Sequence, residues 1–481
     1  MRTSGKRAVS FILMSLMSFT MTSCAKEEET KNVLSMGDEI ITLGDVKLDY
    51  SKAIFDDFSN GVDYSRWIIG NGAWGEKNGG VVPDNVSYTE DGVVLLAGNG
   101  NYYAKEEIKG VGELKDGRST GACLVSKFIT GPGHYEIRMK PLPRKGACTA
   151  FWTYNNRLVP GQKDRDNHEI DIELPGGKES SDISFRNVLN TNYTTEPLNE
   201  SQDVSLAEAT NGKTIFLNDG KFHTFGFEWY TNPKRVVYFV DGYVTAYSDG
   251  KYYVPTYQTR VWIGNWFPSN EAFVGNAEFE RDYLELDWFK YIPFDESQPS
   301  DDVYPEVTIN QALEIQYPKT PVSYPKVNLL ANGDFEYINK KGTQNGFGWN
   351  FSENAHIELT GGPDGSSAAL INGEGSLSTN IDSTYDGFKY KLSLDYFSSG
   401  STPFVEVRFK DLGNHIVSLK TIKYNLPSTG GWTHFEQEFE VPEEINSLNI
   451  RLRSTDPSTK LCVDNVDLAR IYGESWKRRN R

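Results

Sequence analysis

The sequence predicts an all-β chain, and three observations lead to this prediction. Short runs in which apolar and polar residues alternate recur along much of the chain, for example at 134–140 and 222–229. Gly, Asn and Asp separate the runs, and Asp241-Gly242 follows one of them as a hairpin turn would. Strong helical periodicity is absent. Together these features favour β-sandwiches, which are built from two packed sheets.

The N-terminus carries an export signal. Arg2, Lys6 and Arg7 precede an apolar segment at 8–21, the order that is typical of a signal peptide. Cys24 follows in a segment that resembles the lipobox of bacterial lipoproteins. The resemblance implies that Cys24 is acylated and that the lipid anchors the protein in the outer membrane, at the cell surface. The alternative is an ordinary secreted protein with an incidental cysteine.

The length of 481 residues is too great for one ordinary domain. Six prolines lie between residues 293 and 325 among Asp, Glu, Ser and Gln, a composition that is typical of a semi-rigid spacer. We therefore expect six segments: a signal peptide at 1–23, a tether at 24–52, a first β-sandwich at 53–294, a linker at 295–325, a second β-sandwich at 326–472 and a basic tail at 473–481.

The charge and the cysteines exclude some partners. The 49 Lys+Arg and 66 Asp+Glu give a formal net charge of −17, which argues against nucleic acid, because a polyanion needs basic patches. Aromatic residues make up 13 % of the chain and offer flat apolar faces for stacking.

Beside Cys24, we expect Cys123, Cys148 and Cys462 to be thiols, the first two buried, with a disulfide as the less favoured alternative. No Cys/His spacing indicates a zinc site.

The segment 167–175 carries the most informative pattern. Strand alternation would place Glu169, Asp171 and Glu173 on one face and the isoleucines between them on the other. The Cα atoms of successive acids would then lie roughly 7 Å apart. The alternative is a solvated sheet face that binds nothing. Three aligned carboxylates in a strand that ends in Leu-Pro-Gly-Gly favour a chemical role.

Retaining cleavage of a glycosidic bond needs such carboxylates. One acts as nucleophile and the other as acid, about 5–5.5 Å apart. The Cα atoms of Glu169 and Glu173 would lie about 13 Å apart, so only long side chains that lean together on a curved strand would close the distance. Asp171 could hydrogen-bond the nucleophile, and its charge would favour the protonated form of Glu173.

Glu169-Ile-Asp171-Ile-Glu173 resembles the ExDxE signature of family 16 glycoside hydrolases. The resemblance implies a jelly-roll β-sandwich that cleaves β-linked polysaccharides with retention, with Glu169 as nucleophile, Asp171 as assisting acid and Glu173 as general acid/base. Its motif lacks the bulge residue of ExDxxE members and is similar to that of lichenases and xyloglucan-active enzymes. Loops at 95–120, 175–211 and 267–276 depart from the lichenase pattern. Further similar segments lie at 55–58, 85–92, 134–141, 222–229, 240–242 and 286–291.

The resemblance also implies sugar-binding residues and a metal. Core packing is the alternative for the aromatic residues, and ordinary turns are the alternative for the metal positions. No cofactor is needed for the chemistry, but a structural calcium ion is expected on the convex side. The expected sugar contacts are Trp74, Trp152, Tyr154, Asn190, Asn265 and Trp266, and the expected calcium positions are Asp57, Gly92 and Asp287.

The second β-rich region resembles jelly-roll carbohydrate-binding modules of families 4 and 9, from Asn328-Leu-Leu-Ala-Asn-Gly-Asp to Val463-Asp-Asn-Val-Asp. The alternative is a spacer without a ligand.

The whole chain is expected to be a monomeric, surface-anchored endo-β-glycanase for a β-1,3 or mixed β-1,3/1,4-glucan. Alternatives with the same mechanism act on a β-galactan (agar, porphyran or carrageenan) or on xyloglucan, or transfer the sugar to another chain. A non-catalytic glycan-binding lipoprotein is an alternative of another class.

Overall fold

A computed structural model describes much of residues 46–471. Contacts divide the chain into two units, Met1–Ile40 with Arg481 and Ile41–Asn480, and the described residues belong to the second. Among them, no helix is long and apolar enough to cross a membrane. The residues not described are 1–45, 73–78, 104–118, 159–164, 177–181, 191–198, 206–218, 232–233, 250–253, 256, 296–319, 338–347, 382–383, 386, 412–414, 444 and 472–481.

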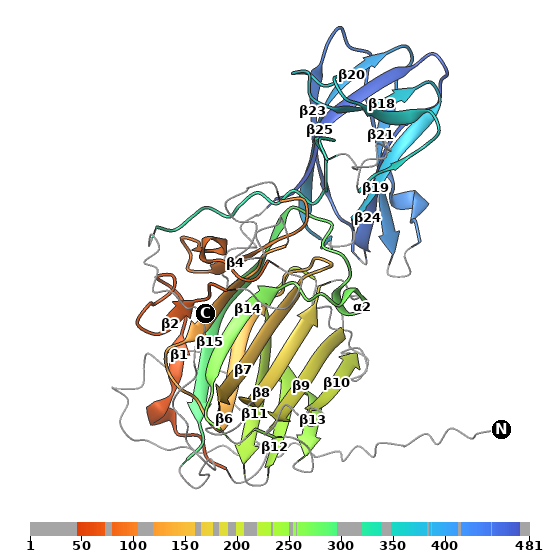
Figure 1. Ribbon diagram of the computed structural model, residues 1–481. Coiled ribbons are helices and arrows are strands. Elements are labelled where there is room, and N and C mark those ends of the chain that lie inside the picture. Colours follow the sequence, from red (N-terminus) through yellow and green to blue (C-terminus); the bar gives the residue numbers. More distant parts are fainter. Residues whose placement is uncertain are drawn as a thin grey trace, which may run out of the picture. The chain divides into compact units, whose positions relative to one another are not determined.

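The prediction of an all-β fold is confirmed. The first β-sandwich has an eight-stranded and a seven-stranded antiparallel sheet, which form two layers (Figure 1). The first sheet has the order β13-β12-β11-β6-β15-β4-β3, with β1 on β15. Its strands are β1 (Ile54–Asp56), β3 (Val86–Tyr88), β4 (Val94–Asn99), β6 (Gly133–Lys140), β11 (His223–Thr231), β12 (Lys234–Val240), β13 (Tyr243–Asp249) and β15 (Arg281–Pro293).

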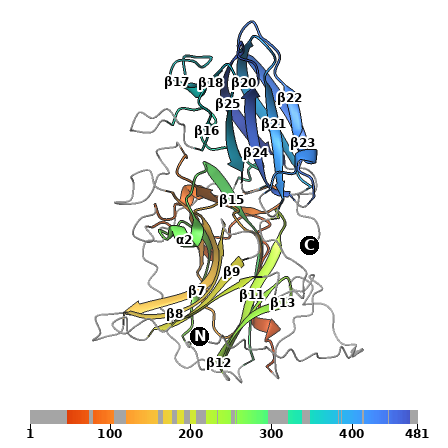
Figure 2. The same cartoon turned by 90° about the vertical axis from the view of Figure 1, so that its right-hand side faces the viewer.

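The seven-stranded sheet has the order β10-β9-β8-β7-β14-β5-β2. Figure 2 shows β7, β8 and β9 in one layer and β11 and β13 in the other. Its strands are β2 (Trp67–Ile69), β5 (Ala122–Ser126), β7 (Cys148–Leu158), β8 (Arg165–Pro175), β9 (Asp182–Asn190), β10 (Asn199–Ser205) and β14 (Arg260–Trp266).

Apolar side chains fill the space between these sheets. Phe151 of β7 contacts Phe227 of β11 and Phe289 of β15, with ring centroids 5.6 Å and 6.1 Å apart. Ile170 and Ile172 of β8 are fully buried in the same cluster. Burial of this apolar area is the main force that holds the two sheets together. The other face of the seven-stranded sheet carries a smaller cluster that includes Trp152, Tyr154, Trp262, Cys123 and Val125.

Short turns and helices connect the strands. Asp241 and Gly242 have φ values of 48° and 77° between β12 and β13, so the predicted hairpin turn is confirmed and has the positive φ angles of type I′. Asn270 caps the N-terminus of the helix α2 (Glu271–Val274), and its Oδ1 accepts a hydrogen bond from the Ala272 amide at 3.1 Å. The 3₁₀ turns are η1 (Tyr50–Lys52), η2 (Pro83–Asn85) and η5 (Ser418–Lys420).

A second β-sandwich with its own core follows, as expected. Its sheets have the orders β16-β19-β24-β21-β22 and β17-β18-β25-β20-β23, and Leu392, Val407 and Ile450 are fully buried between them. The strands are β16 (Asn350–Phe351), β17 (Ala355–Glu358), β18 (Ala368–Asn372), β19 (Gly375–Ile381), β20 (Lys389–Ser399), β21 (Phe404–Asp411), β22 (Ile422–Asn425), β23 (Thr433–Glu440), β24 (Ile445–Ser454) and β25 (Lys460–Arg470).

Candidate functional site

The three acidic residues of β8 share one face of the seven-stranded sheet. Ile170 and Ile172 point into the core, so alternation turns Glu169, Asp171 and Glu173 to the opposite face. The register between β8 and β7 runs without a bulge from Pro175 and Cys148 to Arg165 and Leu158. Because a bulge would shift the alternation, its absence keeps all three carboxylates on the same side.

Two aromatic side chains lie beside these acids. In the register of β7 and β8, Tyr154 is opposite Glu169 and Trp152 is opposite Asp171. Both contact Trp262 of β14: the indoles of Trp152 and Trp262 stack with centroids 5.6 Å apart, and Tyr154 meets Trp262 edge-on at 5.8 Å. Trp262 was not among the predicted site residues, although alternation from Trp266 would have placed it on this face.

Small residues surround Glu173. Its neighbours across the sheet are Ala150 in β7 and then Gly264 in β14. A Cβ atom at Gly264 would lie 2.4 Å from the carbonyl oxygen of Ala122, so this position requires glycine. The next row holds the buried Cys148 and the half-buried Trp266. The small residues Ala150 and Gly264 therefore lie beside Glu173, between a row that holds Trp152 and Trp262 and a row that holds Trp266.

The acids differ in exposure. Asp171 is buried, whereas Glu169 and Glu173 are half-buried and reach solvent. Burial raises the pKa of the Cys148 thiol, and the nearby carboxylates of Glu173 and Asp171 raise it further. This cysteine therefore stays neutral beside the acids. The three described cysteines form no disulfide and are buried, which confirms the prediction of thiols.

Asn265 does not join the acids. It is fully buried on the core side of β14, where its Nδ2 donates to the carbonyl oxygen of Leu96 at 2.9 Å. The expectation that it contacts sugar beside Trp266 is contradicted, because consecutive strand residues point to opposite faces. His168, the residue before Glu169, is also buried, and its ring stacks on that of Tyr257 with centroids 3.8 Å apart.

Three other predicted residues lie wholly or partly outside the described residues. Asn190 is the last residue of β9 and lies opposite Asn167 in β8, but its side chain is outside the described residues. Trp74 and Cys24 also lie outside the described residues.

Of the predicted calcium positions, Asp287 is in β15, and Asp57 and Gly92 lie next to β1 and β4, the strands that pair with β15. Asp287 sits where the register of β15 and β6 shifts, and its carboxylate pairs with the guanidinium of Arg138. Asp57 directly follows β1, where its Oδ1 accepts from the amide of Ser59 at 3.0 Å, and Gly92 lies just before β4. Within the described parts of the chain, no three His, Cys, Asp or Glu side chains cluster as metal ligands would. The carboxylate of Asp287 thus already has a cationic partner, and this donor set does not by itself favour calcium.

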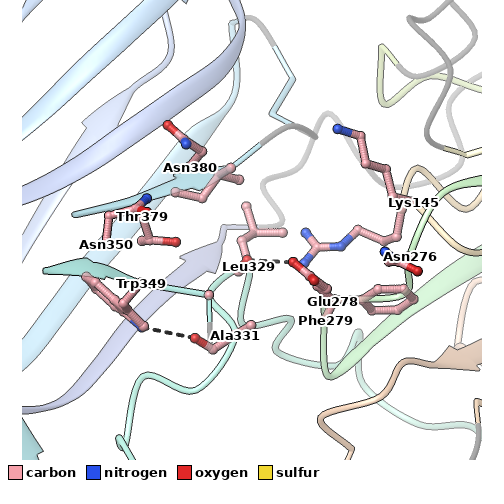
Figure 3. A pocket seen from close by; sticks show the side chains of 13 residues that line it. Lys145, Asn276, Glu278, Phe279, Leu329, Ala331, Trp349, Asn350, Thr379 and Asn380 are labelled. Carbon is pink, nitrogen blue, oxygen red and sulfur yellow. Dashed lines mark hydrogen bonds between the residues drawn. The ribbon is translucent and has the colours of Figure 1, made fainter. Parts of the chain in front are cut away.

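A pocket lies away from the three acids, within the unit Ile41–Asn480. Figure 3 shows it between the loop residues Lys145 and Asn276 of the first sandwich and Trp349 and Asn380 of the second. Arg144 at its wall donates to the carbonyl oxygen of Leu329 at 3.1 Å. None of the acids of β8 lines it.

Comparisons with known proteins find a family and several relatives that resemble part of the chain. Residues 82–289 match the family described as Glycosyl hydrolases family 16. A Beta-glucanase from Paenibacillus macerans is 28% identical over 226 residues, which are 45% of this chain and 80% of that protein. The Beta-glucanase of Bacillus subtilis is 27% identical over 164 residues, 34% of this chain and 58% of that protein.

Solved structures also resemble the chain in part. A lichenase from a mouse hindgut metagenome is 20% identical, covers 50% of this chain and 99% of its own, and gives a TM-score of 0.39. LamA from Zobellia galactanivorans, solved with laminaritriose and laminaritetraose, is 18% identical over 51% of this chain and 98% of its own, with a TM-score of 0.39.

Proposed function

We propose that this chain, a glycoside hydrolase with a family 16 domain at residues 82–289, is a retaining endo-β-glycanase of an extracellular polysaccharide. The observation that carries the proposal is the alignment of Glu169, Asp171 and Glu173 on one face of an unbulged strand, with Trp152 and Tyr154 directly opposite. A purely structural strand would not need three carboxylates beside one another, since their like charges repel.

The two outer acids divide the reaction. The carboxylate of Glu169 attacks the anomeric carbon, while Glu173 donates its proton to the leaving oxygen and the glycosidic bond breaks. The covalent sugar ester on Glu169 is then hydrolysed by a water molecule whose proton returns to Glu173. Asp171 lies between them in β8, and in its protonated form it would donate a hydrogen bond to the carboxylate of Glu169. Its burial suits this positioning role better than direct attack.

The aromatic residues provide the sugar platform. The apolar faces of pyranose rings stack on indole rings, and Trp152 and Trp266 bracket the small residues Ala150 and Gly264. Trp152 is in turn supported by Trp262. A sugar ring over Ala150 would lie next to Glu173, the proton donor. We assign Trp152 and Trp266 to binding and Trp262 to positioning.

The substrate we propose is a β-1,3-glucan or a mixed β-1,3/1,4-glucan. The relatives named Beta-glucanase support this choice. A β-galactan or xyloglucan would use the same acids, and a sugar acceptor in place of water would give transglycosylation. Loops decide between such substrates, because loops shape the ends of a binding face.

The test is the release of reducing ends from a panel of polysaccharides. The native chain should release them from laminarin or barley β-glucan, and product sizes should show internal cleavage. Glu169→Ala should remove this activity while the thermal midpoint stays unchanged. Full turnover by Glu169→Ala contradicts the assigned nucleophile, and activity on a galactan or xyloglucan alone replaces the substrate. Retardation by glucan without any reducing ends indicates a non-catalytic binding protein.

We further propose that Cys24 is acylated and that the protein, as a monomer, is held by lipid at the cell surface. The order of a basic, an apolar and a lipobox-like segment supports this. Cys24→Ser should abolish labelling by a palmitate analogue in growing cells and shift the protein from the membrane to the soluble fraction. Labelling that survives this change contradicts the anchor.

The structural calcium at Asp57, Gly92 and Asp287 remains a proposal as well. If calcium binds there, it must compete with Arg138 for the carboxylate of Asp287. Millimolar calcium should raise the thermal midpoint, and Asp57→Asn should remove this effect. An equal midpoint in calcium and in chelator contradicts the site.

A further inference from the structure

The second β-sandwich carries a concentration of positive charge on one sheet. Its strands β19, β24, β21 and β22 lie side by side in this order. Leu448, Ile450 and Leu452 of β24 are fully buried in the core, so alternation turns the residues between them outward. We call this outward side the basic face, and its cationic residues are Arg408, Lys410, Lys423, Arg451 and Arg453.

The register brings these cations together. Arg451 of β24 lies opposite Glu406 of β21, which lies opposite Lys423 of β22. Arg453 lies two residues further along β24, and Arg408 lies two residues from Glu406 along β21. Residues two apart on a strand are roughly 7 Å apart, so several guanidinium groups share a small area.

An amide network holds part of the basic face in place. Arg408 donates from Nη1 to Oδ1 of Asn449 at 3.3 Å, and Nδ2 of Asn449 donates to Oδ1 of Asn380 at 3.0 Å. Lys410 donates from Nζ to the same Asn380 oxygen at 2.9 Å. These amides orient the cations without neutralising them. Asn380 also lines the pocket of Figure 3, so the face continues to that pocket.

Few acids balance this charge. The four strands contain two acidic residues, Glu406 and, at the bulged end of β21, Asp411, whose carboxylate accepts from the amide of His415 at 2.8 Å. Among the described residues, no carboxylate forms an ion pair with Arg408, Arg451 or Arg453.

The electrostatic cost of this arrangement is visible at Arg451. Burial lowers its pKa, and the neighbouring Arg453 and Arg408 lower it further, whereas Glu406 opposes them. Like charges that outnumber the acids among them destabilise the fold, and a bound anion would relieve the repulsion. On a chain of formal net charge −17, a separate cationic face is thus an unexpected local excess.

We propose that the basic face of the second sandwich binds an anionic polysaccharide through its carboxylate or sulfate groups. Guanidinium groups form paired hydrogen bonds with planar carboxylates and with sulfate oxygens. The hydroxyls of Ser376 and Ser378, which lie opposite Arg453 and Arg451 in β19, supply further groups for sugar hydroxyls. The extended sheet face suits a polymer, whose repeated anions can meet several arginines at once. This binding is separate from the hydrolysis proposed above and does not depend on it.

The test uses the full chain and four polymers. In gel electrophoresis, polygalacturonate or dextran sulfate in the gel should retard the native protein. The first polymer tests carboxylate groups and the second tests sulfate groups. Neutral dextran and poly-glutamate are the controls for sugar alone and for charge alone. Retardation should weaken as salt is raised, because salt screens exposed charges. Equal retardation by poly-glutamate, or none by either anionic polysaccharide, overturns the proposal.

Two kinds of variant make the test specific, because one removes positive charge from the basic face and the other removes negative charge. Arg451→Gln/Arg453→Gln should weaken the affinity at least about tenfold, the loss expected for charge-assisted hydrogen bonds. Glu406→Gln should strengthen it, because it removes the acid between the cations. The control Lys389→Gln/Lys391→Gln removes the same charge from β20, in the other sheet. An equal loss in this control, or unchanged affinity in the arginine variant with an unchanged thermal midpoint, overturns the assignment. If the arginine variant does not fold, the Glu406→Gln result decides.

Discussion

The indole of Trp152 stacks on that of Trp262, with ring centroids 5.6 Å apart and planes inclined by 25°. Trp152 is directly opposite Asp171 in the neighbouring strand. The pair therefore forms a rigid aromatic wall beside the middle acid. Because both rings stand on strands that pack against the core, the wall needs no ligand to form it.

Loss of this support should weaken substrate binding more than catalysis. Trp262→Ala leaves Trp152 without its stacked partner, and we expect KM for the β-glucan to rise about two- to tenfold, since an aromatic pair contributes about 0.5–1.5 kcal/mol beyond its buried area. Steady-state kinetics measure this split between KM and kcat. Trp262→Phe should restore most of the loss, and an unchanged KM in the alanine variant would contradict the role of the pair.

The two faces of β8 should separate stability from activity. Ile172→Ala opens a cavity in the core and should lower the free energy of unfolding by about 2–4 kcal/mol with little effect on kcat at low temperature. Glu173→Gln should keep or raise the stability, because the amide is neutral at every pH and cannot repel the neighbouring carboxylates, while hydrolysis falls by orders of magnitude. Urea unfolding and reducing-end assays on both variants give the comparison. A strongly destabilised Glu173→Gln protein would mean that this acid is structural.

Stability should fall between about pH 6.5 and 9 through His223. Burial lowers the pKa of this imidazole, but hydrogen bonds to Asp219 at 3.0 Å and Asp241 at 2.7 Å outweigh it and raise the pKa to about 9. A raised pKa in the folded state stabilises the fold fully below the unfolded value and is lost as pH rises through the folded value. The contribution is at most about 3 kcal/mol.

His223→Gln should flatten this part of the stability profile, measured as the thermal midpoint against pH. The exposed His415 provides the matched control, since His415→Gln should leave the slope in place. A native profile that is flat from pH 6.5 to 9 would show that His223 is not held as a cation.

A buried ion pair joins β15 to β25. Arg470 donates to both carboxylate oxygens of Asp282 at 3.1 Å and 3.2 Å, and both side chains are almost completely buried. Arg470→Met should cost about 3–5 kcal/mol, because it strands a buried carboxylate. The double variant Asp282→Leu/Arg470→Met should recover much of this loss in calorimetry. A single variant as stable as the native chain would show that water reaches Asp282.

Local alternation made some of this structure predictable. Strand residues alternate between two faces whatever the fold, so the sequence alone placed Glu169, Asp171 and Glu173 together and their isoleucines in the core. Along β14 the same rule separates Asn265 from Trp266 and adds Trp262 to the face of Trp266. The positive φ angles of Asp241 and Gly242 were likewise predictable, because Asp-Gly favours a two-residue hairpin turn.

The sequence by itself determined the all-β character of both modules, the hairpin turn at Asp241-Gly242 and the shared face of the three acids, because each depends on residues close together in the chain. Only the tertiary structure decided which strands became neighbours. It set Trp152 opposite Asp171, put Gly264 in the row of Glu173, paired Arg138 with Asp287 and gathered the arginines of β21 and β24. Strand order and register arise from the packing of whole sheets, which no local pattern contains.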